Sequence, residues 1–363
     1  REAVAEVLGV PLERDPAVAA RVEEHFARRE RRMPDNNLRQ ADVPRGATVI
    51  EQVRGTAPGL VCPNGSQVIY VLPGVPHEMM EMAGRAVLPD IARRQAEAGQ
   101  DGVVLSRVLR TWGVGESTLA ETLRGRVAAH EAGTERGAGS SESGTKRAAG
   151  VTIAFLASGV EGMKVRLTTR ARDREAALAL LDAEEQEIRR VLAGVHGDIV
   201  FGVDDVNMER AVAALLVGRG LTLGIAESLT GGLLASRLVD VAGASAWFRG
   251  CVVAYDPAVK RDVLGVPAGP VVTAEAAVAM AAGARRVLGA DIGLALTGVA
   301  GPASQEGITP GTVLVGLVLA DGETSARELR LPGDRQSVRW YAAISALDIL
   351  RRALGEGGDR VRR

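Results

Sequence analysis

The sequence predicts a mixed α/β protein with three parts, and three observations lead to this prediction. The chain has 363 residues, which at roughly 100–200 residues per domain corresponds to two or three domains. Apolar residues make up 46% of it, and the formal net charge is −1, which excludes a disordered protein. Helical patterns alternate with short apolar runs, most regularly after residue 208, as in α/β domains. We place the three parts at residues 1–101, 102–203 and 204–363.

Composition also limits the classes of function. The 44 basic and 45 acidic residues nearly cancel, whereas a dedicated nucleic-acid binder usually has a basic excess that neutralises phosphates. No apolar run approaches the roughly 18–20 residues needed to span a bilayer. Cys62 and Cys251 form no metal or disulfide pattern, and no secretory signal is recognisable. We therefore expect a cytoplasmic protein that does not bind nucleic acid or membranes directly.

The first part is expected to contain helices separated by long loops. Val18, Val22 and Phe26 recur at i, i+4 and i+8, which predicts one helix. A strand over residues 67–72 is followed by a glycine turn and a helix that starts near Pro76. The chain begins at Arg1 with residues already in helical pattern, so we expect the sequence to start inside a domain.

The middle part is expected to follow a β-α-β-β-α-β order, the split βαβ arrangement. The residues from 133 to 150 are rich in Gly, Ser and charge, which predicts a flexible insertion. No catalytic group of residues is recognisable in this part, which favours a spacer or a dimerisation module. The predicted elements are strand 103–111, helix 116–130, strand 151–157, strand 163–169, helix 174–192 and strand 199–201.

The last part alternates helices and strands over about 145 residues, which predicts a compact three-layer α/β domain. The predicted strands cover residues 221–226, 248–255, 291–296, 312–319 and 326–331. The predicted helices cover residues 209–217, 233–241, 259–264, 274–288 and 335–354.

Two strands of the last part end in glycine-rich turns. One turn is Ser228-Leu229-Thr230-Gly231-Gly232, and the other is Thr297-Gly298-Val299-Ala300-Gly301. Glycine lets the backbone approach a ligand closely, the following helix can offer free N–H groups, and the hydroxyls of Ser228 and Thr230 add donors. A single glycine-rich turn after a strand is common for steric reasons alone and does not by itself indicate a ligand site. Two at carboxyl strand ends of one domain favour an anion site, most simply for a phosphate.

Ser245, Tyr255 and Lys260 lie around one predicted strand and are candidates for nucleophile, proton relay and base. A lysine whose pKa is lowered by partial burial and neighbouring cations can accept the proton of a serine. Only three of the 44 basic residues are lysines, which modestly favours a specific role for Lys260. The alternatives are a solvated helix residue for Lys260 and a helix cap for Ser245.

Arg335 and Arg339 share one face at the start of the closing helix. They can clamp a phosphate or carboxylate, or simply pair with Asp334 and surface acids. The four histidines all precede the last part, which excludes a Ser-His-Asp triad there. No His, Cys and carboxylate cluster in the last part has zinc spacing either.

These motifs together resemble the CinA family of competence/damage-inducible proteins. The first part resembles the family's molybdopterin-binding-like domain, and the middle part is similar to its KH-like linker domain. Two features depart from the family pattern: Asp256-Pro257 replaces a frequent Ser-Asn pair, and residues 303–307 replace a glycine-rich tract. The motifs that carry the resemblance are residues 33–34, 55–59, 72–79, 226–232, 243–260, 297–302 and 333–339.

The resemblance implies a nicotinamide-nucleotide amidohydrolase that needs no cofactor. Its reaction turns nicotinamide mononucleotide and water into nicotinate mononucleotide and ammonia, a step in pyridine nucleotide recycling. Lys260 would activate Ser245, and Tyr255 would orient the pair or relay the proton. Ser228 is the rival nucleophile, placed instead on the substrate and oxyanion side because it precedes a helix. The remaining substrate-binding residues would be Glu227, Thr230, Gly231, Thr297, Gly298, Ala300, Gly301, Arg335 and Arg339.

The resemblance also suggests two other functions. The family's first domain is associated with metal-dependent ADP-ribose pyrophosphatase activity, but its Gly-Gly loop and paired aspartates would precede Arg1. The residues that remain of this site are Asn37, Pro58, Gly74 and Glu78, so we expect no pyrophosphatase activity from this chain. A divalent metal would belong only to a complete first domain. The other function is that of a non-enzymatic partner in DNA uptake and recombination; a homodimer is the expected assembly.

Overall fold

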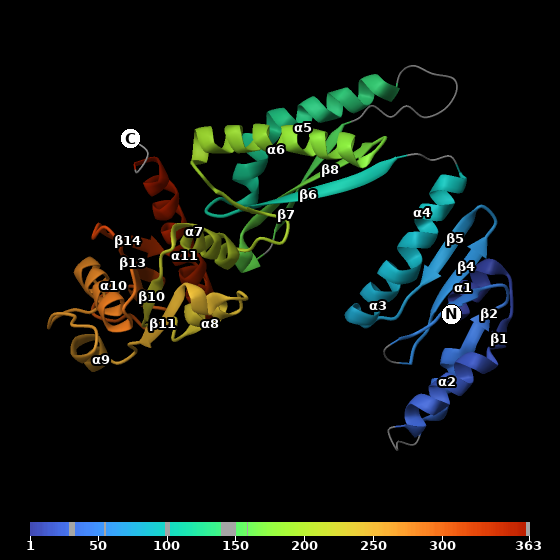
Figure 1. Cartoon of the computed structure of the whole chain (residues 1–363), viewed down its shortest axis with the longest axis horizontal. Helices are drawn as coiled ribbons and strands as arrows, with labels where there is room; N and C mark the ends of the chain where they lie inside the picture. Colours follow the sequence, from blue (N-terminus) through green and yellow to red (C-terminus); the bar gives the residue numbers. More distant parts are fainter. Residues whose placement is uncertain (29–32, 54–55, 99–101, 139–149, 158, 361–363) are drawn as a thin grey trace. The chain divides into compact units, whose positions relative to one another are not determined.

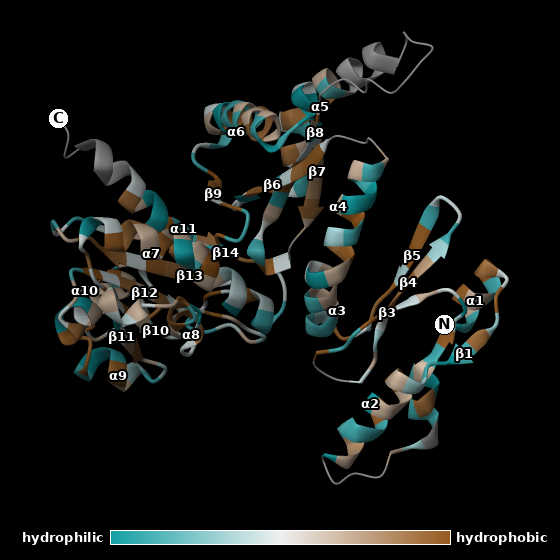
Figure 2. Cartoon of the chain, turned by 45° about the vertical axis from the view of Figure 1, so that its right-hand side comes forward, coloured by the Kyte–Doolittle hydropathy of each residue, from teal (hydrophilic) through white to brown (hydrophobic). Residues whose placement is uncertain are grey.

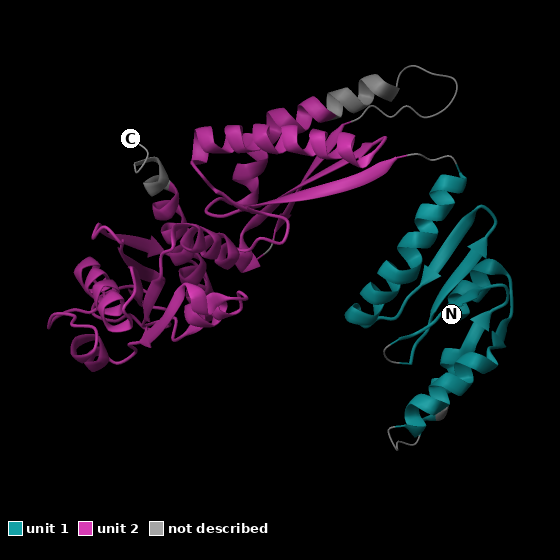
Figure 3. Cartoon of the chain, in the orientation of Figure 1, with its two compact units in different colours: residues 1–101 teal, residues 102–363 magenta. Residues whose placement is uncertain are grey.

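The chain folds into two compact units, residues 1–101 and 102–363, in the computed structural model (Figures 1 and 3). The structure describes residues 1–28, 33–53, 56–98, 102–138, 150–157 and 159–360. The predicted mixed α/β class is confirmed, because helices and four separate sheets occur in the described residues. The division of residues 102–363 near residue 203 stays a prediction. No described helix has both the length and the apolar character that crossing a bilayer requires.

The first unit contains two small antiparallel sheets, β1-β2 and β3-β4-β5. Asp15 caps its second helix by accepting hydrogen bonds from the N–H groups of Ala17 and Val18, and Val18 and Val22 are buried as their spacing predicts. Its elements are α1 (Glu2–Leu8), β1 (Leu12–Arg14), α2 (Pro16–Ala27), β2 (Asp42–Pro44), β3 (Thr48–Ile50), β4 (Gly59–Asn64), β5 (Gln67–Val71), α3 (Pro76–Met82) and α4 (Leu88–Glu97).

The next four strands form one antiparallel sheet in the order β7-β8-β6-β9, covered by two helices. The predicted β-α-β-β-α-β order is confirmed. One boundary was wrong: the first helix continues to Ala138 instead of ending near residue 130, and residues 139–149 of the predicted insertion lie outside the described residues. The elements are β6 (Val103–Thr111), α5 (Glu116–Ala138), β7 (Val151–Ala157), β8 (Met163–Ala171), α6 (Arg174–His196) and β9 (Val200–Val203).

The remaining residues form a five-stranded sheet in the order β11-β10-β12-β13-β14. The first three strands in this order are parallel, and β13 and β14 are antiparallel to their neighbours. The elements are α7 (Met208–Arg219), β10 (Leu223–Glu227), α8 (Leu233–Val239), β11 (Phe248–Val253), α9 (Pro257–Asp262), α10 (Ala274–Leu288), β12 (Ile292–Gly298), β13 (Thr312–Val318), β14 (Thr324–Arg330) and α11 (Arg335–Arg360).

The largest core lies on one face of this sheet, where α7, α8 and α11 pack, and a second core lies on the other face under α10. Every residue of β10 and β13 is buried, and Figure 2 shows brown, hydrophobic residues along the central strands. Strands buried on both faces read as continuous apolar runs, which is why the sequence showed them clearly. The predicted three-layer arrangement is confirmed.

Polar and aromatic contacts join this last sheet to the β6–β9 sheet within the second unit. The guanidinium of Arg351 on α11 is buried and donates to Asp198, which precedes β9, and to Asp348. Trp112, after β6, lies against Tyr341 of α11 with ring centroids 6.2 Å apart.

Candidate active site

The carboxyl ends of the parallel strands β10, β11 and β12 lie at one edge of the sheet. Ser228 directly follows β10, and its N–H donates to the carbonyl of Leu296 in β12 at 3.0 Å. The N–H of Ala254, just after β11, donates to the carbonyl of Glu227 at 2.8 Å. Ser228 is buried, whereas Tyr255 is 60% exposed. This edge therefore brings Ser228 close to the chain segment that leads to Tyr255 and Lys260.

Lys260 lies on the short helix α9 and is only 3% exposed. Asp256 caps this helix by accepting from the N–H of Ala258 at 2.7 Å, with Pro257 at its first position, so the departure from the family pattern still gives a well-formed helix start. Burial lowers the pKa of the Lys260 ammonium from its ordinary value, and the negative charge of Glu306 opposes this shift. The structure thus excludes the solvated position considered for this lysine.

The predicted grouping of Ser245 with Tyr255 and Lys260 is wrong. Ser245 is exposed in a short 3-10 helix that precedes β11, whereas Tyr255 and Lys260 follow it. Phe248, at the start of β11, is opposite Leu223, at the start of β10. A strand of six residues is about 20 Å long, so Ser245 lies at the opposite edge of the sheet from Ser228. Ser228, which follows β10, lies at the same edge as Lys260.

Glu227 serves the fold rather than a ligand, which corrects its predicted role in substrate binding. Its fully buried carboxylate accepts from the N–H groups of Gly232, Leu234 and Ala235 at 2.9, 3.1 and 2.7 Å, and from the thiol of Cys251 at 3.6 Å. These are N–H groups at the start of α8, the ones expected to face a ligand. The carboxylate therefore occupies the helix terminus from inside the protein.

We expect Glu227→Ala to destabilise the second unit by about 3 kcal/mol, because it leaves one buried and two part-buried backbone N–H donors without an acceptor. Cys251→Ala removes one weak donor and is expected to cost about 1 kcal/mol. Urea unfolding followed by circular dichroism measures both. Glu275→Ala, at an exposed position in the first turn of α10, is the matched control, and a loss for Glu227→Ala no larger than for this control would contradict the assigned role.

Two backbone donors remain in the turn after Ser228. In the part of the chain that the structure describes, the N–H groups of Leu229 and Thr230 have no hydrogen-bond acceptor. The hydroxyl oxygen of Thr230 is also buried and without a partner. Backbone N–H groups directly after a serine are well placed to stabilise an oxyanion formed by attack of that serine. The N–H groups at the start of α8, which the sequence analysis expected to be free, are occupied by Glu227, and the free ones in this turn are those of Leu229 and Thr230.

The second glycine-rich turn is also at this edge, after β12. The buried hydroxyl of Thr297 donates to the carbonyl of Val271 at 2.8 Å, so toward a ligand it can only accept. A Cβ at Gly298 would lie 2.5 Å from the carbonyl oxygen of Thr312, so this glycine is required by the close approach of β13. Ala300 is buried, and Gly301 has φ +86°, a backbone conformation that favours glycine.

Arg335 and Arg339 organise the loops of this edge. Arg335 donates to the carbonyl of Gly301 at 2.8 Å and to the hydroxyl of Tyr255 at 2.7 Å. Arg339 donates to the carbonyls of Leu229 and Thr230 at 3.1 and 2.7 Å. The alternative of pairing with Asp334 is not observed, and each guanidinium keeps N–H groups that a bound anion can use.

Glu306 is a residue that the sequence analysis missed. It lies in the loop between β12 and β13 with φ +53°, and its carboxylate accepts from the N–H of Val271 at 3.1 Å. Val271 is also the residue whose carbonyl binds Thr297, so this contact fixes the loop beside the turn. A single acid next to Gly307 in a loop of small residues was the available signal.

The four residues of the predicted partial site in the first unit are not joined to one another by any hydrogen bond among its described residues. Asn37 accepts from Gln40, the carbonyl of Pro58 accepts from Arg1, and Glu78 accepts from Gln52. Gly74 has open space around its Cα. In the described ranges of the whole chain, no group of three His, Cys, Asp or Glu residues is arranged to hold a metal ion.

Comparison with known proteins gives a consistent result. A CinA C-terminal domain model matches residues 205–354, which include the whole edge just described. A CinA-like protein of Frankia casuarinae is 47% identical over 98% of this chain and 78% of its own length. One from Dictyoglomus turgidum is 36% identical over 92% of this chain and 76% of its own length.

A solved CinA superfamily structure from Klebsiella pneumoniae is 33% identical, covers 41% of this chain and 96% of its own, and has a TM-score of 0.40. The long, nearly full-length matches to curated CinA-like proteins are the ones that establish a family. Together with the sheet edge formed by the turns at residues 228–232 and 297–301, they show that this chain belongs to the CinA family.

Proposed function

We propose that this chain hydrolyses the carboxamide of nicotinamide mononucleotide, giving nicotinate mononucleotide and ammonia. The observation that carries the proposal is the buried Lys260, at the sheet edge where Ser228 is also buried. No histidine occurs after residue 196, so a serine at this edge depends on another base. Burial lowers the pKa of Lys260 and so favours its neutral amine, the form that can act as that base.

The first step is the transfer of the Ser228 proton to the neutral amine of Lys260. The Ser228 Oγ then bonds to the carboxamide carbon, whose carbonyl oxygen becomes an oxyanion. The free N–H groups of Leu229 and Thr230 are the donors for this charge. In this assignment Ser228 is the nucleophile, and the catalytic role first considered for Ser245 is withdrawn.

The second step breaks the C–N bond. The ammonium of Lys260 returns its proton to the departing nitrogen, which leaves as ammonia, and an ester remains on Ser228. Water then adds to the ester carbon while Lys260 accepts its proton. Collapse of this second intermediate breaks its bond to the Ser228 Oγ, which recovers the proton from Lys260. The carboxylic acid that is released gives its remaining proton to water and becomes the carboxylate of the product. Tyr255, whose hydroxyl accepts a hydrogen bond from Arg335, would orient the substrate or relay a proton.

The single phosphate of this substrate fits the cationic side of the edge. Arg335 and Arg339 come from α11 and already hold both glycine-rich turns, so an anion between the turns would meet preorganised guanidinium groups. Gly231, with φ +60°, keeps this space open, since its nearest neighbour on the Cβ side is the Arg339 guanidinium at 3.8 Å.

The test of the proposal is ammonia release from nicotinamide mononucleotide by the wild-type chain. Nicotinamide riboside, which lacks the phosphate, is the matched control and is expected to react with a much higher KM. No ammonia from the mononucleotide under any buffer condition would overturn the proposal.

The rate should depend on pH through Lys260. Because the amine must be neutral to accept the serine proton, kcat/KM is expected to rise with pH and level off above the pKa of Lys260. Burial lowers this pKa, so the midpoint should lie below the ordinary lysine value of about 10.4. Glu306→Gln removes the charge that raises this pKa, so its midpoint should move to lower pH still. A midpoint that stays unchanged in this variant would contradict the assignment of Lys260 as the base.

A further inference from the structure

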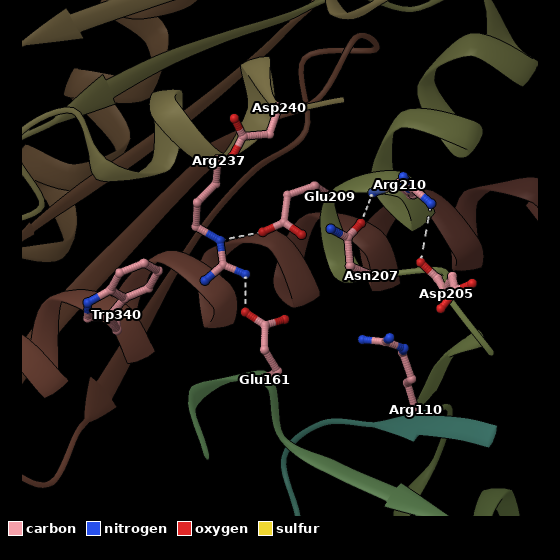
Figure 4. Close-up of a pocket in the computed structure, with 9 residues that line it drawn as sticks. All are labelled: Arg110, Glu161, Asp205, Asn207, Glu209, Arg210, Arg237, Asp240 and Trp340. Carbon is pink, nitrogen blue, oxygen red and sulfur yellow. Dashed lines mark hydrogen bonds and ion pairs between the residues drawn. The ribbon is translucent and has the colours of Figure 1, made fainter. Parts of the chain in front are cut away.

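A cavity in the second unit is lined by side chains of α7, α8 and α11 together with residues of the β6–β9 part (Figure 4). Its volume is about 600 Å³, which is within the usual range for small-molecule sites. None of the catalytic or substrate-binding residues proposed above contributes to its wall. The lining residues are Arg110, Glu161, Asp205, Asn207, Glu209, Arg210, Arg237, Asp240 and Trp340.

Arg237 of α8 is a buried side chain in the wall of this cavity. It is 8% exposed, and its guanidinium lies 5.4 Å from the ring centroid of Trp340. Its Nε donates to Glu209 on α7, and its Nη2 donates to Glu161 at 2.9 Å, which Figure 4 shows as two dashed lines. One guanidinium therefore faces two carboxylates, and the net charge of these three side chains is −1.

Glu209 has a polar atom without a partner. The residue is 2% exposed, and its Oε2 forms no hydrogen bond within the described residues, while Oε1 is used by Arg237. In Figure 4 its carboxylate lies in the middle of the lining side chains. A buried carboxylate oxygen without a donor is unfavourable, and a cationic donor is its best complement. The Nη1 of Arg237 also has no hydrogen-bond partner among the described residues, but two carboxylates already face this guanidinium, so the charge that this part of the cavity lacks is positive, such as an ammonium group.

Arg110 and Arg210 give the cavity a cationic side. Neither forms an ion pair with a described residue, and each uses one donor on a backbone carbonyl, that of Asp204 and that of Asp205 respectively. Their remaining N–H groups suit a carboxylate. Asp205 and Asp240 also line the wall, so a ligand with a large net negative charge would be repelled.

We propose that this cavity binds a small zwitterion, with an ammonium group on Glu209 and a carboxylate at Arg110 and Arg210. A zwitterion matches both the unpartnered acid and the unpaired cations, and its zero net charge avoids repulsion by the other acids. This inference does not depend on the proposed amidohydrolase activity, because none of the residues that carry it belongs to that site.

The experiment is calorimetric titration of the full chain with the series of unbranched ω-amino acids from glycine to 6-aminohexanoate. The series varies the distance between the two charges, so the member that binds best measures the span of the site. Hexylamine and hexanoate, each with one charge, are the matched probes. We expect at least one zwitterion to bind saturably, about tenfold or more tighter than either single-charge probe. No saturable heat with any member would overturn the proposal.

Two variants separate the two ends of the site. Glu209→Gln should remove the preference for the zwitterion over hexanoate, and Arg210→Gln should remove the preference over hexylamine. Glu209 is buried, so its variant can disturb folding, whereas Arg210 is exposed and its variant is expected to fold. The Arg210 variant therefore still tests the site if the Glu209 variant does not fold. Unchanged zwitterion affinity in a folded Arg210→Gln protein would contradict the assigned carboxylate position.

Discussion

Lys260→Met is expected to lower the rate of ammonia release from nicotinamide mononucleotide by about a thousandfold, the size of effect typical of a lost general base. The variant removes the amine that accepts and returns the Ser228 proton and keeps a side chain of similar length. The measurement is the steady-state rate of ammonia release under saturating substrate.

Stability separates this loss from unfolding. Lys260 is buried, and burial disfavours its charged form, so replacing it by an apolar side chain should leave the melting temperature unchanged or raise it. Lys164→Met in β8 is the matched lysine control and should retain the wild-type rate. A Lys260→Met protein that keeps more than about a tenth of the activity would exclude this lysine as the base.

Ser228→Ala is expected to cause a loss of similar size, about a thousandfold, and Ser245→Ala should leave the rate near the wild-type value. The reason is position: Ser228 follows β10 at the edge that holds Lys260, and Ser245 precedes β11 at the other edge. Both serines are replaced by the same residue, so each variant is the control for the other.

The double variant adds a second criterion. If Ser228 and Lys260 act as a pair, Ser228→Ala combined with Lys260→Met should lose little more activity than either single variant, because catalytic residues that act together are not additive. The reverse pattern, with activity lost in Ser245→Ala and kept in Ser228→Ala, would restore the first interpretation of the sequence.

The sequence predicted the elements of the second unit well, and the reason is visible in the burial pattern. Strands β10, β12 and β13 are almost entirely buried, so they appear as apolar runs bounded by glycine turns. The turns that follow β10 and β12 therefore fell at the correct edge of the sheet. Lys260 was singled out because lysine is rare in this chain, and the structure shows that it is buried, while its role as a base stays a proposal.

Two errors have physical causes. Ser245 lies just before β11 and Tyr255 just after it, so the two residues are close in sequence. The extended strand between them nevertheless holds them at opposite edges of the sheet. Glu227 stands beside a glycine turn, and the sequence cannot show that its carboxylate turns back to the start of α8. In the first case the sequence does not show which edge of the sheet a strand end reaches, and in the second it does not show where a side chain points; the folded structure shows both.

The buried contacts of α11 and Arg237 have a consequence for how the second unit unfolds. Arg351 reaches Asp198, and Arg237 reaches Glu161, so side chains of the last sheet's helices are held by residues of the β6–β9 part. Separating the two parts would break these ion pairs and would also expose Trp112, which packs against Tyr341 and the core of the last sheet, so the loss of this apolar contact opposes separation before either core has melted. Each sheet therefore gains stability from the other, and we expect residues 102–363 to unfold in one cooperative step, although separate hydrophobic cores lie in the β6–β9 part and on both faces of the last sheet.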